Sequence, residues 1–313
     1  MGKSLHERKN LLRYIPNYVG LAPFFILLVV FILTPMIYGL AMSFTDWSVS
    51  SGRRGIHFTG LANYRYVLNG QSVTSTRFLK SLINLAIYVP ITITVSVVIS
   101  LSLALIINNL PGGLYRFFRS AYFIPTALPL FLCTGIWRWL MATDAGLVSV
   151  FLAKLGIGAG IDWVNTGGYA IAMIVMVDVW NTVGFNFIIL STGMQDISPE
   201  LYEAADIDGA SVFQKMTRIT IPMLEPIIFF VITYSFISAL QVYDIPTILT
   251  SHTDINNLGG PGQIALFPVM EIVRNVYGGS VSGLGRAVAE GVILMCLIMV
   301  ITVIQFKVRR KRV

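Results

Sequence analysis

Long apolar stretches alternate along this chain with shorter segments that hold most of its polar residues. A helix needs about 20 consecutive apolar residues to cross the hydrocarbon core of a bilayer. Six stretches meet this length, at about residues 20–42, 82–107, 121–141, 169–191, 226–248 and 286–306. The pattern therefore predicts an all-α integral membrane protein, in which residues 20–306 form a transmembrane domain of six helices.

Composition agrees with a membrane environment for much of the chain. Hydrophobic residues make up 55% of its 313 residues and charged residues only 12%, whereas about a quarter of the residues of a soluble domain are charged. The mean hydropathy is +0.75. These values exclude an ordinary soluble globular protein.

Basic residues gather at both ends of the chain, in a tail at 1–19 and another at 307–313. Lysine and arginine are retained on the cytoplasmic flanks of membrane spans, and an even number of spans places both ends on one side. We therefore expect both tails in the cytoplasm, and we attribute the net charge of +7 to topology and not to nucleic-acid binding. The segment at about 43–81 would then lie outside, yet it holds five basic residues, contrary to this rule. The predicted orientation therefore depends on the two tails.

The segment 193–225 is too polar to cross lipid, and its capping residues predict two short helices. Ser198 is placed to cap a helix that begins at Pro199, where the missing backbone donor is not needed. Ser211 and Gln214 have the spacing of a capping box for a second helix. Gly209 can supply the left-handed residue between the two. By capping alone, a solvated linker between spans fits equally well.

The string EAADIDGASVFQKMTRITIPMLEP, from Glu203 to Pro226, distinguishes these alternatives. It resembles the EAA loop of bacterial ABC importer permeases, whose pattern is EAA, three residues, Gly, nine residues and I-x-L-P. The matching positions are Glu203, Ala204, Ala205, Gly209, Ile219 and Pro222. Ile221 stands in place of the usual Leu. The resemblance implies the six-helix bundle of a type I ABC importer permease, with 193–225 as its cytoplasmic coupling loop.

The resemblance extends over most of the chain. It points to the sugar-type permeases, similar to the maltose and glycerol-phosphate permeases. The segments that carry it are FTGLANY from Phe58 to Tyr64, DVWNTVGFN from Asp178 to Asn186, QDISPELY from Gln195 to Tyr202, and Tyr243-Asp244. Two departures are visible. Residues Ser251 to Leu258 separate Thr250 from the Gly259-Gly260-Pro261 that usually follows directly, and Glu290 stands where a small residue is usual.

The resemblance implies a permease subunit of an ATP-driven importer, forming half of the translocation path for a sugar, oligosaccharide or sugar derivative in the bacterial inner membrane. Such a subunit is not itself an enzyme: ATP and Mg bind to two separate cytoplasmic ATPase subunits. A second related permease and an extracytoplasmic substrate-binding protein complete the assembly. The residues implied in coupling to the ATPase are Glu203, Ala204, Ala205, Asp208, Gly209, Ile219 and Pro222.

Polar residues within the fourth and fifth apolar stretches are the candidates for a substrate path. They are Asp178, Asn181, Asn186, Ser238, Gln241, Tyr243 and Asp244. Carboxylate, amide and hydroxyl groups can bind sugar hydroxyls, and aromatic rings can pack on the apolar faces of sugars. The alternative is that these side chains join helices to one another by buried hydrogen bonds.

Two other classes of membrane protein are weaker interpretations. An ion-coupled secondary transporter of a small polar solute would have inverted repeats, broken helices and an intramembrane carboxylate, and Asp178 meets only the last condition. A membrane enzyme would need clustered acids or histidines, yet the three histidines are far apart and both cysteines lie in apolar stretches. Gly2-Lys3-Ser4 lacks the earlier glycine of a P-loop. We therefore expect no catalytic, cofactor or metal site in this chain.

Overall fold

The computed structural model describes residues 19–48, 56–143, 145–158, 160–250, 257–278 and 283–310. Helices dominate these ranges, and the only pairing of extended residues that they contain is an isolated bridge between Thr45 and Phe58. The basic residues of the N-terminal tail, Lys311, Arg312 and residues 251–256 lie outside the described residues. The predictions that concern them therefore have no structural counterpart.

Four of the helices have the length and apolar character of membrane spans. They are Val19–Met42, which contains η1 (Val29–Leu33) and α2 (Thr34–Met42), α4 (Val73–Ile107), α8 (Gly167–Gln195) and α15 (Leu284–Arg310). Two bent pairs would raise the number to six if each crosses as one span. One pair is α5 (Gly112–Ala127) with α6 (Leu130–Leu140), and the other is Val212–Met223 with α12 (Glu225–Leu240).

The apolar stretch at 121–141, predicted as one span, is divided in the structure. α5 ends at Ala127, and α6 continues from Leu130 at an angle of 94° to it. Leu128, the residue between them that precedes Pro129, is extended, with φ −81° and ψ 147°, as the ring of a following proline favours. The apolar helix of this region thus begins at Gly112, earlier than predicted, and the region counts as a span only if α5 and α6 are taken together. Hydropathy missed the turn because both helices are apolar.

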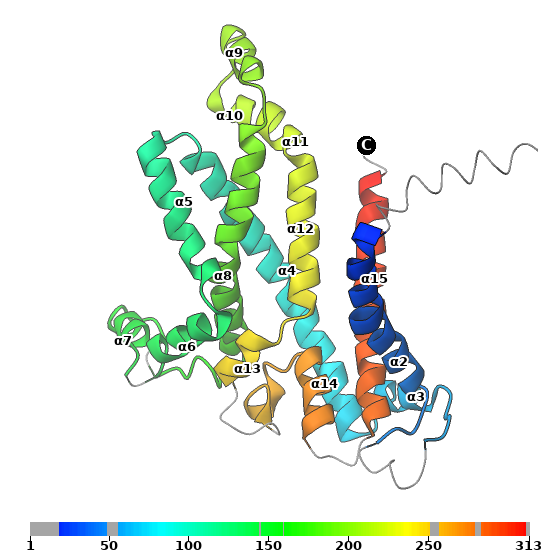
Figure 1. Ribbon diagram of the computed structural model, residues 1–313. Coiled ribbons are helices and arrows are strands. Elements are labelled where there is room, and N and C mark those ends of the chain that lie inside the picture. The colour runs from blue at the N-terminus through cyan, green and yellow to red at the C-terminus, as the bar shows by residue number, and fades with distance from the viewer. Residues whose placement is uncertain are drawn as a thin grey trace, which may run out of the picture.

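The long helices run side by side between two ends of the bundle (Figure 1). At the α9 end lie α9 (Pro199–Ile207), α10 (Val212–Lys215), η3 (Met216–Thr220) and α11 (Ile221–Met223), and α15 finishes at this end. At the α14 end lie α3 (Ala62–Leu68), α6, α7 (Leu147–Lys154), α13 (Asp244–Thr250), η5 (Pro261–Gln263) and α14 (Pro268–Tyr277). The coupling loop predicted from sequence and the short helices after α12 are thus at opposite ends.

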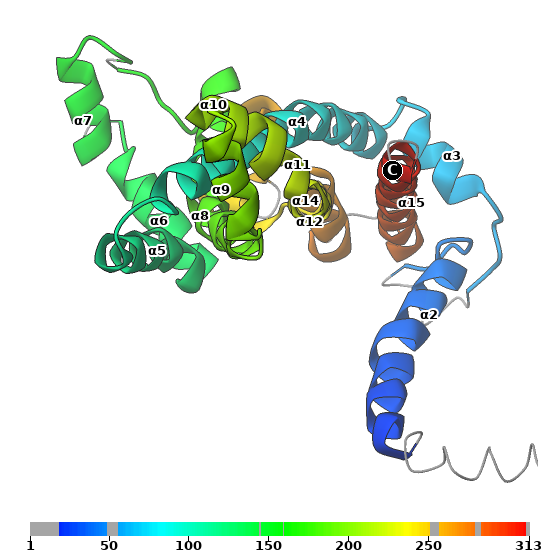
Figure 2. The ribbon, with the colours of Figure 1, turned by 90° about the horizontal axis from the view of Figure 1, so that it is seen from above.

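The packed core lies where α4 and α8 meet, with α5 and α12 beside them. Tyr88 of α4 and Phe187 of α8 are fully buried there. A Cβ atom at Gly184 would overlap the backbone carbonyl of Tyr122, so glycine at this position permits the close approach of α5 to α8. The helix Val19–Met42 stands apart from this core, beside α15 (Figure 2).

Candidate coupling loop and transport cavity

The segment between α8 and α12 forms two short helices around a glycine corner, as the capping pattern predicts. The Gln214 amide N–H donates to Ser211 Oγ at 3.3 Å, and the Ser211 amide N–H donates to Gln214 Oε1 at 2.7 Å, which completes the capping box. Gly209 has φ +73°. α9 begins at Pro199, but the Ser198 side chain makes no capping hydrogen bond, so that detail of the prediction is wrong.

This loop presents most of its predicted coupling residues to the surface. Glu203, Ala204, Asp208, Gly209 and Pro222 are exposed, and Ala205 and Ile219 are half-buried. Three large apolar side chains that sequence reasoning did not single out are exposed beside them: Ile207 at 88%, Val212 at 78% and Phe213 at 67%. Apolar residues gathered on an exposed surface are typical of an interaction site. The role of the seven residues in coupling remains a prediction.

Two contacts fasten the loop helices to each other. Lys215 Nζ donates to Asp206 Oδ1 at 2.6 Å, which joins α10 to α9. The hydroxyl groups of Tyr202 and Thr220 lie 2.9 Å apart and join α9 to η3. The loop therefore has an internal structure of its own at the α9 end.

A cavity of about 350 Å³ opens between α4, α8 and α12, with Thr126 of α5 on one side. Four of the predicted path residues line it, namely Asp178, Asn181, Asn186 and Ser238, together with hydroxyl and aromatic side chains that include Thr182, Phe185, Tyr234 and Ser235. The other three do not line it. Gln241 and Tyr243 follow the end of α12, and Asp244 begins α13. The structure thus brings together only the predicted path residues that lie within α8 and α12.

The polar residues of the cavity also join its walls. Tyr88 Oη donates to Asp178 Oδ2 at 2.5 Å, and Asn181 Nδ2 donates to the Pro125 carbonyl at 2.8 Å. Asn186 Nδ2 lies 3.0 Å from Ser96 Oγ and donates to it. These contacts show that the side chains hold α8 to α4 and α5. Their role in a substrate path remains a prediction.

A regular polar stripe on α4 was missed by the sequence reasoning. It consists of Lys80, Asn84, Tyr88, Thr92, Ser96 and Ser100, each four residues after the one before. All but Lys80 are buried, and Thr92 Oγ1 lines the cavity without a hydrogen-bond partner among the described residues. Residues four apart are neighbours on the surface of a helix, and a row of them winds slowly around the helix axis because four residues turn about 400°. The spacing alone would have identified this stripe within an apolar stretch.

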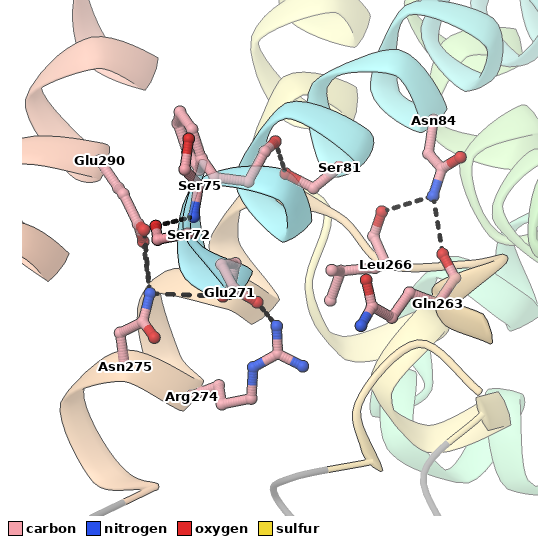
Figure 3. A network of polar contacts seen from close by, with 11 residues as sticks. Ser72, Ser75, Ser81, Asn84, Gln263, Leu266, Glu271, Arg274, Asn275 and Glu290 are labelled. Carbon is pink, nitrogen blue, oxygen red and sulfur yellow. Dashed lines mark hydrogen bonds and ion pairs between the residues drawn. The ribbon is translucent and has the colours of Figure 1, made fainter. Parts of the chain in front are cut away.

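Glu290 of α15 is buried away from this cavity, in a polar cluster with three residues of α14 (Figure 3). Asn275 Nδ2 donates to both carboxylate oxygens of Glu290, at 2.9 and 3.0 Å, and Glu271 and Arg274 form an ion pair. Burial, and next the Arg77 charge, lower the pKa of Arg274 to about 10, while Glu290 opposes the shift. The guanidinium remains charged at neutral pH. The unusual glutamate thus helps to fasten α14 to α15.

Residues 76–312 match the family described as binding-protein-dependent transport system inner membrane component. The chain belongs to this family. Its relatives include the sulfoquinovosyl glycerol transport system permease protein SmoG of Agrobacterium fabrum, 33% identical over 93% of this chain and 89% of the relative. The arabinooligosaccharides permease protein AraP of Bacillus subtilis is 29% identical over 93% and 87%. The trehalose/maltose permease protein MalF of Thermococcus litoralis is 31% identical over 82% and 81%.

A solved structure, that of a bacterial alginate ABC transporter in complex with its periplasmic protein bound to an alginate pentasaccharide, includes a chain with the same fold. The two chains superpose with a TM-score of 0.81 at 21% identity, over 97% of this chain and 96% of the other. The predicted fold class, an all-α type I ABC importer permease, is confirmed. This protein is a transmembrane permease subunit of an ABC importer, and the relatives give no support to an ion-coupled transporter.

Proposed function

We propose that this permease carries a sugar, oligosaccharide or sugar derivative across the bacterial inner membrane. The cavity between α4, α8 and α12 is the observation that carries this proposal. It combines one carboxylate, two amides, several hydroxyls and the rings of Phe185 and Tyr234, which is the mixture that a polyhydroxylated ligand with apolar ring faces needs. The names of the relatives, which refer to glycosides and oligosaccharides, point to the same class of ligand.

The cavity forms half of a path, which a second related permease completes. Tyr234 and Ser238 of its lining, both on α12, are exposed at the surface of this chain, where another chain can contact them. A binding protein outside the membrane delivers the substrate to the paired permeases. The family description, which names binding-protein-dependent transport, supports this part of the proposal.

Two separate cytoplasmic ATPase subunits bind ATP and Mg and drive transport through the coupling loop. Glu203, Ala204, Asp208 and Gly209 offer them a small, exposed and acidic surface. Pro222 is exposed as well, and Ala205 and Ile219 are half-buried. Small alanines permit close approach of another chain, and a carboxylate can form a charge-assisted contact. The α9 end and both termini are therefore cytoplasmic, and the α14 end faces outward.

The direct test is to purify the chain with its partners and to measure ATP hydrolysis in proteoliposomes while a panel of sugars is supplied with the binding protein. We expect hydrolysis only when the ATPase subunits are present, and stimulation by one sugar class. Robust hydrolysis by the lone chain would contradict the division of labour. Stimulation by ions or amino acids, and by no sugar, would contradict the substrate class.

The orientation has its own test. A single cysteine replaces Ser211, an exposed residue of the coupling loop, in a background that lacks Cys133 and Cys296. We expect a membrane-impermeant thiol reagent to label Ser211→Cys only from the cytoplasmic side. Labelling from outside intact cells would reverse the proposed topology.

A further inference from the structure

The family does not determine the charge of the transported sugar. One bacterial ABC transporter of the same fold is involved in the import of alginate, an acidic polysaccharide. The arabinooligosaccharides named for the Bacillus subtilis relative carry no charged group. The charge that a given permease accepts therefore depends on the residues of its own path, which in this chain form the cavity between α4, α8 and α12.

Asp178 gives this cavity a negative charge that no cation of its lining balances. It is the one carboxylate of the lining, and the described residues around the cavity include no lysine, arginine or histidine. Two basic residues of adjacent helices bind elsewhere. Lys80 of α4 donates to the Gly262 carbonyl, and Arg138 of α6 donates to the Ile248 carbonyl. This side of the path is therefore acidic.

Tyr88 holds the Asp178 carboxylate in place and leaves part of it available. The phenol donates to Asp178 Oδ2 at 2.5 Å, a distance typical of a hydrogen bond to an ionised oxygen. Tyr88 is fully buried, and its ring packs edge-on against Phe267. Asp178 itself is half-buried, and among the described residues Oδ1 has no hydrogen-bond partner. Oδ1 can therefore accept a hydrogen bond from a ligand in the cavity.

Thr92, one turn after Tyr88 on α4, has a second polar group that needs a partner. Its side chain lines the cavity and is only 3% exposed, yet Oγ1 has no hydrogen-bond partner among the described residues. Buried hydroxyl groups are normally hydrogen-bonded. A sugar hydroxyl both donates and accepts, so neutral sugars suit Thr92 and Asp178 alike. An anionic group can accept from Thr92 but would face the Asp178 carboxylate.

We propose that Asp178 determines specificity by excluding anionic sugars, so that this permease carries sugars without a carboxylate, sulfonate or phosphate group. The inference deepens the proposed function and rests on the cavity being the substrate path. In a cavity of about 350 Å³ a second negative charge cannot move far from Asp178. Repulsion between like charges is stronger there than in bulk water. A neutral sugar instead donates a hydroxyl group to the carboxylate.

The charge of the cavity can be measured without any sugar. A cysteine replaces Ser238 in one variant and Ser235 in another, because both line the cavity on α12. The complete transporter, without Cys133 and Cys296, is labelled in detergent with two methanethiosulfonates, one bearing an ammonium group and one a sulfonate group. The ratio of the ammonium rate to the sulfonate rate should fall about tenfold when Asp178→Asn is added.

Two further variants show whether the effect comes from the charge at this position. Asp178→Glu keeps the charge and should keep the ratio. Asp196→Asn removes a carboxylate that follows the same helix, α8, outside the cavity lining, and should also leave the ratio unchanged. An unchanged ratio in Asp178→Asn, or an equal fall in Asp196→Asn, would overturn the proposal. Failure of both cysteines to react with either reagent would also overturn it, because the cavity would then be closed to solutes.

Uptake in proteoliposomes tests the sugar itself. The transported sugar is compared with its uronic acid, in which a carboxylate replaces the terminal hydroxymethyl group, and the same binding protein is used throughout. The parent should take up the uronic acid at least tenfold more slowly, and Asp178→Asn should reduce this difference about fivefold. Equal uptake of both compounds by the parent would overturn the proposal. If no sugar is transported, the proposed function fails, whereas the labelling ratio still reports the charge of the cavity.

Discussion

The coupling loop and the loop at residues 257–267 lie at opposite ends of the same bundle. Contacts between residues close in sequence hold the first loop, and contacts between residues far apart in sequence hold the second. In the coupling loop, the fastening pairs are near neighbours in the chain, such as Ser211 with Gln214 and Asp206 with Lys215. The 257–267 loop is fastened by Lys80 and Asn84, about 180 residues away in sequence. The first loop is a self-contained unit that presents a surface to a partner, whereas the second is part of the packing of the spans.

The largest effect is expected at the α14 end, where charges are buried. Arg274→Met removes one partner of the buried ion pair with Glu271. An unpaired buried charge costs about 3 to 5 kcal/mol, so we expect a sharp fall in the thermal unfolding temperature and in the amount of protein in the membrane. Thermal unfolding in detergent, followed by fluorescence, measures it.

The matched control is the double variant Glu271→Leu with Arg274→Met. Removing both partners leaves no unpaired charge in that pair, and replacement of a buried ion pair by apolar residues is often neutral. Most of the lost stability should therefore return. The result to compare is the loss of stability in the double variant with the sum of the losses in Glu271→Leu and Arg274→Met. If the two are equal, the residues are not coupled, and the contrast between the two ends of the bundle weakens.

At the α9 end the expected effect is smaller and comes from backbone geometry. A Cβ at Gly209 meets nothing within 4 Å, so Gly209→Val acts only through its φ of +73°. A β-branched residue in this conformation is strained by about 1 to 3 kcal/mol. We expect uptake by the complete transporter to fall while insertion and pairing of the permeases are retained.

Gly209→Asn is the control for this change, since asparagine tolerates the left-handed conformation. It should retain most of the uptake. Equal loss in both variants would show that side-chain size, and not backbone conformation, matters at this corner. Normal uptake in Gly209→Val would mean that the loop is only a connector.

The smallest effect is expected from the ion pair between the two loop helices. Lys215→Met removes the contact with Asp206, whose side chain is 59% exposed. Surface pairs contribute about 0.2 to 1 kcal/mol. Uptake should therefore change by less than about twofold, and Asp206→Asn in the same chain should add no further change. A severe loss of uptake would indicate that Lys215 contacts another chain.

The sequence predicted what depends on local chemistry. Hydropathy located the apolar stretches, and the spacing of Ser211, Gln214 and Gly209 predicted the corner of the coupling loop. The turn between α5 and α6 was missed because the residues on both sides of Leu128 are apolar, so that only the two prolines marked it. The stripe on α4 was visible as a spacing of four, but its partners were not, because Asn84 and the 257–267 loop meet only through the packing of the spans.

The central claim is that the coupling loop of this permease transmits ATP hydrolysis from a separate subunit to substrate movement. Glu203→Lys tests it in the reconstituted transporter, with uptake and ATP hydrolysis measured together. Asp196→Lys is the control, because Asp196 is an exposed acidic residue of the same segment that precedes α9 and lies outside the EAA match. A reversed charge at an interface costs several kcal/mol, so uptake should fall about tenfold or more, with the ATPase released or hydrolysing ATP without transport. Uptake and hydrolysis at the parental ratio in Glu203→Lys would contradict the account.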